Sequence, residues 1–121
     1  MRVIATGSRK WANALAVYDA LWDVYQKQHA FHLVHGACAT GADALAAQWF
    51  RVAGQYLGCT VETFPANWAG RGKAAGPERN RRMVNAGADL VLPFPLPEGT
   101  GTQMTMQYAK EMGIKVRVIE P

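Results

Sequence analysis

Long apolar runs, paired cysteines and the common nucleotide-binding glycine motifs are all missing from this sequence of 121 residues. The longest apolar stretch, residues 90–97, is interrupted by prolines, so we expect neither a membrane span nor a signal peptide. The two cysteines, Cys38 and Cys59, form no Cys-x-x-Cys pair, which argues against a disulfide framework and a zinc site. Neither the Walker A pattern nor Gly-x-Gly-x-x-Gly is present, which disfavours nucleoside triphosphatases and NAD dehydrogenases. We therefore expect a cytoplasmic protein with reduced thiols, no metal and no cofactor.

Charge is also scarce, and its distribution is informative. Charged residues make up 18% of the chain and hydrophobic residues 50%, which excludes a disordered acidic tail and a highly charged coiled coil. The net charge is +4, and a single segment, residues 71–82, carries the excess. This concentration favours a localised anionic partner. The segment contains Arg71, Lys73, Arg79, Arg81 and Arg82 against one acid, Glu78.

Short β-type runs alternate with longer helical patterns along the chain. The expected strands are residues 2–5, 31–35, 60–64, 89–94 and 115–119. The alternation predicts a single α/β domain over residues 1–121. It would be a Rossmann-like three-layer domain, with a mainly parallel five-stranded sheet and helices on both faces. Ligands of such sheets bind beyond the carboxyl ends of the strands.

Apolar periodicity predicts which side of each helix faces the core. The first helix would bury Leu15, Tyr18, Leu21, Trp22 and Tyr25, and the second Leu45, Ala46, Trp49, Phe50 and Ala53. A third helix is expected over residues 77–85, with Met83 and Val84 inward, and a fourth over 103–112, burying Met106 and Ala109. We expect Pro77 at the first position of its helix, and Gly58, Gly87 and Gly113 in left-handed conformations at helix ends.

Three of the loops that follow predicted strands carry glycines, namely residues 7–11, 36–43 and 97–102. Glycines there let backbone amides approach an anion beside a helix N-terminus, although any α/β protein also needs glycine at tight turns. If the first and fourth strands are neighbours, the first and third of these loops flank one crevice. Asp43 is predicted to form a capping arrangement with Thr40, with ligand contact as the alternative. Thr100 and Thr102 could cap the fourth helix and also face a bound phosphate.

Residues 65–82 form a glycine-rich, basic connection. If Met83 faces the core, Arg79 and Asn80 point toward the strand ends, which makes them site candidates, whereas Arg81 and Arg82 lie on the surface. Trp68 could stack on a base or anchor the loop; both interpretations stay open.

Three histidines recur in this sequence without suggesting a metal triad. His32 and His35 belong to one predicted strand at a spacing that places them on opposite faces. His35, at the carboxyl end of that strand, could reach the crevice, but we interpret it as a hydrogen-bonded turn residue.

Several motifs, taken in order along the chain, resemble the YspA/YpsA-related branch of the SLOG superfamily. They are Gly7-Ser8-Arg9, His35-Gly36 with Gly41-Ala42-Asp43, Pro65-Ala66-x-Trp68, the segment from Gly70 to Met83, and Gly99-Thr100-Gly101-Thr102. The resemblance spans nearly the whole chain and implies a Rossmann-like domain that binds a nucleotide or a derivative such as an ADP-ribose-type ligand. It also leaves open a homodimer. The ligand-binding residues that we carry forward from the motifs and the loop analysis are Gly7, Ser8, Arg9, Gly36, Asp43, Trp68, Arg79, Asn80, Gly99, Thr100, Gly101 and Thr102.

The superfamily also contains the LOG phosphoribohydrolases, whose Pro-Gly-Gly-x-Gly-Thr-x-x-Glu motif is similar to residues 97–105. Glu98 replaces the first glycine of that motif, and Thr105 stands where the catalytic glutamate belongs. Threonine cannot act as an ionised acid or base near neutral pH. Glu98 is then the remaining catalytic candidate.

Three hypotheses follow for function. The leading one is a cytosolic module that binds or senses a nucleotide-like small molecule. The first alternative is an N-glycosidic phosphoribohydrolase of the LOG type, using Glu98 or a water held by Asp43. The second is single-stranded nucleic-acid binding through residues 71–82, by analogy with the superfamily member DprA.

Overall fold

The computed structural model describes residues 1–121 and contains one five-stranded sheet, in which every neighbouring pair of strands is parallel. The order across the sheet is β3-β2-β1-β4-β5. This arrangement confirms the predicted α/β, Rossmann-like fold. The strands are β1 (Arg2–Gly7), β2 (His32–His35), β3 (Thr60–Thr63), β4 (Leu90–Phe94) and β5 (Lys115–Val116).

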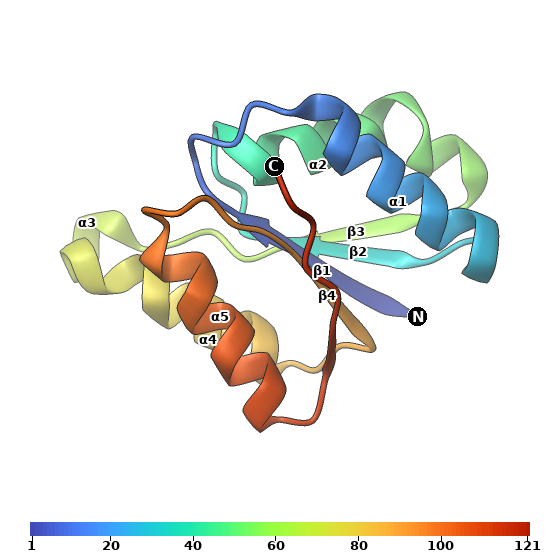
Figure 1. Ribbon diagram of the computed structural model, residues 1–121. Coiled ribbons are helices and arrows are strands. Elements are labelled where there is room, and N and C mark those ends of the chain that lie inside the picture. The colour runs from blue at the N-terminus through green and yellow to red at the C-terminus, as the bar shows by residue number, and fades with distance from the viewer.

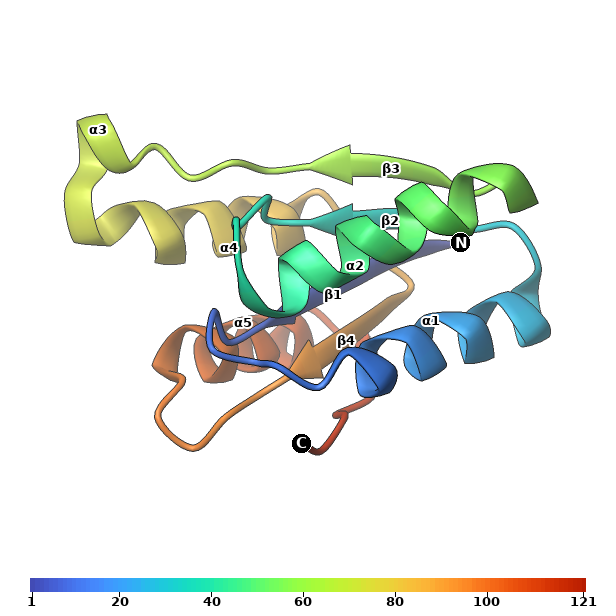
Figure 2. The same cartoon turned by 90° about the horizontal axis from the view of Figure 1, so that it is seen from above.

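Helices cover both faces of the sheet, as Figures 1 and 2 show. One face carries α1 (Ala14–Gln28) and α2 (Gly41–Val52), which the short 3-10 helix η1 (Gly54–Leu57) follows. The other face carries α4 (Ala75–Asn85) and α5 (Thr100–Glu111). Between β3 and α4 the chain forms α3 (Trp68–Arg71) and the 3-10 turn η2 (Gly72–Ala74), which extend past the strand ends. None of the helices combines the length and apolar character that crossing a bilayer requires.

Side-chain alternation along β1 divides the core into two layers. Val3 and Ala5 face α1 and α2, in a cluster of 16 buried residues. Ile4 faces α4 and α5, in a smaller cluster of 6 that includes Met83 and Val84. The predicted inward positions of α4 and α5 are therefore confirmed, including Met106 and Ala109.

The predicted core face of α1 is wrong in part. The helix buries Val17, Ala20, Leu21 and Val24, whereas two residues predicted to face the core, Leu15 and Trp22, are 71% and 39% exposed. The helix starts at Ala14 because Asn13 caps it, accepting a hydrogen bond from the Ala16 amide. Packing of Val17, Ala20, Leu21 and Val24 into the core leaves Leu15 on the solvent side of α1.

The predicted helix-end residues are confirmed for the glycines but not for the proline. Gly58, Gly87 and Gly113 all have positive φ, as predicted. Pro77 does not occupy the first position of its helix, because α4 begins two residues earlier at Ala75.

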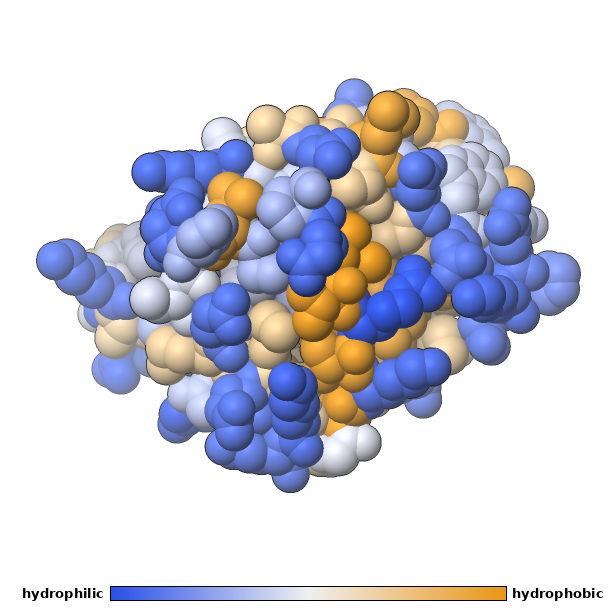
Figure 3. All heavy atoms as spheres, viewed as in Figure 1, coloured by the Kyte–Doolittle hydropathy of each residue, from blue (hydrophilic) through white to orange (hydrophobic).

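The C-terminal segment forms the edge of the sheet beside β4. Only Lys115 and Val116 pair as a regular strand, which is shorter than predicted, but the amides of Arg117 and Ile119 still donate to carbonyls of β4. In the view of Figure 3 a hydrophobic strip runs down the molecule where this segment passes in Figure 1. Val118, in this segment, is an exposed hydrophobic residue.

Candidate functional site

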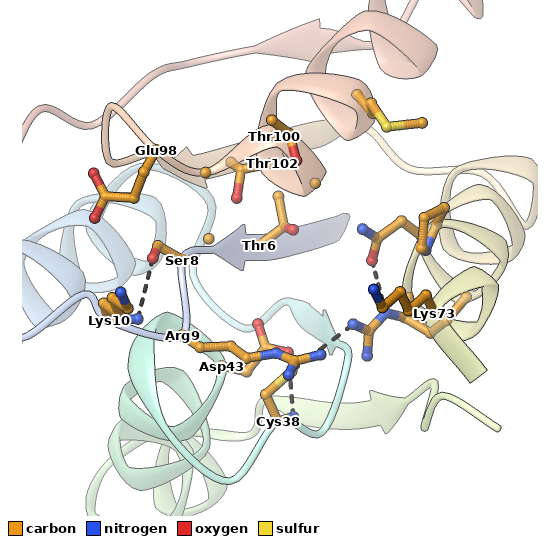
Figure 4. Close-up of a pocket in the computed structure, with 18 of the residues that line it drawn as sticks. Thr6, Ser8, Arg9, Lys10, Cys38, Asp43, Lys73, Glu98, Thr100 and Thr102 are labelled. Atoms are coloured by element: carbon orange, nitrogen blue, oxygen red, sulfur yellow. Dashed lines mark hydrogen bonds between the residues drawn. The ribbon is translucent and has the colours of Figure 1, made fainter. Parts of the chain in front are cut away.

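A cavity of about 460 Å³ opens at the carboxyl ends of the strands. Because β1 and β4 are neighbours, the loops after them meet there, as expected at the point where the strand order reverses. The loop after β2, the α3–α4 segment and the start of α5 complete the walls (Figure 4). This size falls in the range of small-molecule sites.

The structure brings together every predicted site residue except Gly36. Glu98, the catalytic candidate, also lines the cavity. The lining residues that were predicted are Gly7, Ser8, Arg9, Asp43, Trp68, Arg79, Asn80, Glu98, Gly99, Thr100, Gly101 and Thr102. Those that sequence reasoning missed are Thr6, Lys10, Cys38, Lys73, Gly76, Pro77 and Met104.

The first turn of α5 presents backbone donors to the cavity. Gly99 is its N-cap residue, and no side chain caps the helix, so the expectation that Thr100 or Thr102 caps it is wrong. The N–H groups of Thr100, Gly101 and Thr102 have no carbonyl partner within a helix. They add the positive end of the helix dipole to this wall of the cavity.

Arg79 is a buried guanidinium that the surrounding backbone holds in place. Its side chain is 6% exposed and donates to the carbonyl oxygens of Gly36 and Phe64. Gly36 does not line the cavity, because it lies behind Arg79. A Cβ at Gly36 would overlap the Arg79 guanidinium, so glycine is required there for packing.

Arg79 also fixes the orientation of Asn80, which is 8% exposed. The Nε–H of Arg79 can only donate, and it donates to Asn80 Oδ1 at 2.7 Å. The Nδ2 amino group of Asn80 must then point the other way, toward the cavity wall beside Gly101. The pair therefore presents a cation and an oriented amide donor from one helix.

Asp43 contributes a buried carboxylate from the first turn of α2. Its Oδ2 accepts a hydrogen bond from the Cys38 amide at 3.3 Å, and its residue is 5% exposed. The predicted capping arrangement with Thr40 is wrong, because the Thr40 side chain forms no cap hydrogen bond. The carboxylate instead turns back to the loop after β2, on the wall shown with Cys38 in Figure 4.

Burial keeps the two neighbouring titratable side chains neutral. It raises the pKa of the Cys38 thiol, and the nearby Asp43 carboxylate acts in the same direction. It lowers the pKa of His35, with Asp43 opposing and Arg79 reinforcing that change. His35 Nδ1 accepts a hydrogen bond from the Ala37 amide at 3.0 Å, which confirms its interpretation as a turn residue.

Basic groups outnumber acidic ones around the cavity. Arg9, Lys10, Lys73 and Arg79 line it, against the carboxylates of Asp43 and Glu98. The hydroxyl-bearing side chains of Thr6 and Thr102 lie in residues that are each 5% exposed, and they add further polar groups to the lining. The arrangement is suited to an anion that also carries hydroxyl groups.

The missed lining residues had weak signals in the sequence. Thr6 continues the β1 alternation on the same face as Ile4, so extending the predicted strand by one residue would have found it. Lys10 and Lys73 belong to segments already singled out, but only the fold shows that their side chains reach the cavity.

The residues considered for hydrolysis differ in burial and in whether they line the cavity. Glu98 is exposed at the rim, and Thr105 is fully buried, where its hydroxyl donates to the Gly101 carbonyl at 3.0 Å. Thr105 does not line the cavity. Asp43 is therefore the buried carboxylate that faces the cavity.

The basic segment is dispersed by the fold. Arg71 pairs with Glu78, Arg82 donates to the Pro65 carbonyl, and Arg81 packs over the Tyr108 ring. Lys73 and Arg79 face the cavity. The segment therefore does not present its charges as one continuous strip.

Comparison with known proteins places the chain among its relatives. Residues 1–70 match the YspA, cpYpsA-related SLOG family. The Gene 61 protein of Mycobacterium phage D29 is 41% identical over 117 residues, covering 95% of this chain and 93% of the phage protein. The C-terminal domain of a hydrogenase from Pyrococcus furiosus has the same type of fold, with a TM-score of 0.55, 17% identity, and coverage of 98% of this chain and 90% of that one. The chain thus belongs to the YspA, cpYpsA-related SLOG family.

Proposed function

We propose that the cavity binds a nucleotide or nucleotide derivative, with its phosphate against the first turn of α5. The observation that carries the proposal is the convergence of uncapped α5 amides with the buried Arg79 guanidinium in one cavity. A phosphate needs several donors in a fixed arrangement, and helix N-termini and arginine side chains supply them. Family membership supports the same class of ligand.

The cavity also offers groups for the sugar. Ribose hydroxyls donate hydrogen bonds, and the Asp43 carboxylate is a buried acceptor with a single donor in the chain, the Cys38 amide. The oriented Nδ2 group of Asn80 can donate to a ribose or phosphate oxygen. The mixture of donors with one buried acceptor favours a phosphorylated nucleoside over a simple inorganic anion.

The test is calorimetric titration of the protein with AMP and with ADP-ribose. We expect saturable binding of at least one of them. Arg79→Lys keeps the charge but loses the forked donors that hold Gly36, Phe64 and Asn80, so it should weaken affinity by about tenfold or more. Arg81→Lys makes the same exchange on the exposed side of α4 and should leave affinity unchanged.

Two results would contradict the proposal. One is the absence of binding for every nucleotide tested, when the wild-type protein is verified to be folded under the titration conditions. The other is an equal loss of affinity in Arg79→Lys and Arg81→Lys, which would mean that the ligand is attracted by overall charge and not by the cavity.

A second candidate function is cleavage of the N-glycosidic bond in the same cavity, favoured by the two carboxylates that line it. Release of free adenine from AMP would establish it. Asp43→Asn and Glu98→Gln distinguish the two acids, and loss of release in only one variant would identify the group that the reaction needs. Binding without release would leave the protein as a nucleotide-binding module.

A further inference from the structure

Two side chains that line the cavity, from segments far apart in the sequence, contact each other. Arg9 belongs to the loop after β1, and Trp68 begins α3. The guanidinium carbon of Arg9 lies 4.5 Å from the centroid of the Trp68 ring. Both residues line the cavity, so the contact joins two of the segments that form its walls.

The Arg9 side chain is held weakly in this contact, so a ligand can replace it. Arg9 is exposed and has no carboxylate within ion-pair distance. Its placement therefore rests on an exposed cation–π contact, which is weak. Arg79 is the opposite case, since it is buried and bonded to two backbone carbonyls.

The Trp68 ring, in contrast, is supported from behind. A Cβ at Gly76, near the start of α4, would lie 3.2 Å from the Trp68 ring, so the absence of a side chain there lets the ring approach the helix. Asn67 holds the backbone of α3 by accepting from the Gly70 amide at 3.1 Å. Trp68 is nevertheless 45% exposed. A large flat apolar surface is thus fixed at the cavity, with one removable side chain over it.

We propose that the face of Trp68 now covered by Arg9 is the stacking site for the aromatic base of the ligand. The base takes the position of the guanidinium against Trp68, and Arg9 moves outward to cover the other side of the base. Stacking of a base on an aromatic ring is stronger than an exposed cation–π contact, so the exchange is favourable. Planar guanidinium groups also stack on bases.

This inference rests on the proposed function and sharpens it. The phosphate lies at the α5 end of the cavity and the base at the Trp68 end, with the ribose between them near Asp43 and Asn80. The ligand class is therefore a nucleotide with an aromatic base. A sugar phosphate would fill only the α5 end and would gain nothing from Trp68.

The experiment compares AMP with ribose 5-phosphate, which lacks the base. Affinities for both are measured by NMR titration on the wild type, Trp68→Leu and Trp68→Phe. Trp22→Leu is the control, because Trp22 is also partly exposed but lies on α1, away from the cavity. Thermal melting of each variant verifies that it is folded at the titration temperature.

We expect Trp68→Leu to weaken AMP binding by about tenfold or more while leaving ribose 5-phosphate binding unchanged. Trp68→Phe, which keeps a smaller ring, should retain part of the AMP affinity. Trp22→Leu should change neither ligand. Arg9→Ala should weaken AMP binding by a smaller factor than Trp68→Leu does.

The outcomes separate the inference from the proposed function. Undiminished AMP affinity in Trp68→Leu, or equal losses for AMP and ribose 5-phosphate, would overturn the stacking site alone. A wild-type protein that binds neither AMP nor ADP-ribose would overturn both proposals.

Discussion

The two faces of the sheet differ in what they bury. The face under α1 and α2 packs 16 buried apolar residues, including the large rings of Trp49 and Phe94. The face under α4 and α5 packs only 6, and its helices also bury polar residues such as Arg79 and Asn80. The α1–α2 face therefore supplies most of the hydrophobic stabilisation. The α4–α5 face buries less apolar area and places polar residues at the cavity instead.

The division begins in the strands themselves. Along β1, Ala5 faces the thick apolar layer, and Thr6 faces the α4–α5 side at the cavity. The same alternation that builds a core at the middle of the strand delivers a hydroxyl to the ligand site at its end. Stability and binding should consequently respond to different substitutions.

The largest expected effect is on stability and comes from the α1–α2 face. Trp49 is 1% exposed, stacks on Phe31 with centroids 5.7 Å apart, and contacts Trp22 edge-on. Trp49→Ala should lower the free energy of unfolding by about 3–5 kcal/mol in chemical denaturation. The affinity of the folded protein for AMP should not change. A loss below about 1 kcal/mol would mean that this layer is less important than its packing indicates.

The next effect is on binding and comes from the α4–α5 face. Asn80→Asp keeps an acceptor for the Arg79 Nε–H but replaces the donor group in the cavity by a second oxygen and a negative charge. AMP affinity should fall by about tenfold or more, which is about 1.4 kcal/mol. Asn85→Asp, the same change at the exposed end of α4, is the matched control. Equal AMP affinities of the two variants would show that Asn80 does not contact the ligand.

A smaller effect is expected from pH, through His35. Burial lowers the pKa of this imidazole below 6.5, with the charges of Asp43 and Arg79 acting in opposite directions. The unfolded chain therefore takes up a proton at a pH where the folded protein does not. The resulting stabilisation is fully present above about pH 6.5 and is lost as the pH falls below it.

Thermal unfolding between about pH 7.5 and about pH 5.5 measures this loss. His35→Asn, which can still accept from the Ala37 amide, should show a weaker decline over the same range. A steeper decline in the variant than in the wild type would contradict the assignment.

The smallest effect is expected at Leu15, on the exposed side of α1. Leu15→Ala should change the free energy of unfolding by less than about 0.5 kcal/mol, because the side chain is 71% exposed. Val17→Ala, two residues later and fully buried, should cost about 1 kcal/mol or more. Denaturant titration of both variants would test the rotation of α1. Equal losses would show that it is misplaced.

Much of this molecule could be predicted from its sequence because local signals agreed with the fold. The β-runs and helical patterns alternate regularly, and the inward positions of Met83 and Val84 fixed the direction of Arg79 and Asn80. The neighbouring position of β1 and β4, which the combined site required, is a property of the topology and was confirmed.

The remaining details depend on tertiary contacts that no local pattern encodes. Thr40 and Asp43 have capping spacing, yet Asp43 bonds to the Cys38 amide across the loop. Gly36 matches an anion-binding loop, yet it makes room for the Arg79 guanidinium. The reach of Lys10 and Lys73 into the cavity likewise follows from how the loops fold over the strand ends.

The most direct test is an NMR titration with AMP that follows the backbone amides individually. We expect saturable shifts of the amides at the start of α5, residues 99–102, together with Gly7 and Ser8 after β1. Residues 54–58, at the opposite end of the sheet, should remain unchanged. Shifts confined to that opposite end, or none at the start of α5, would contradict the cavity as the ligand site.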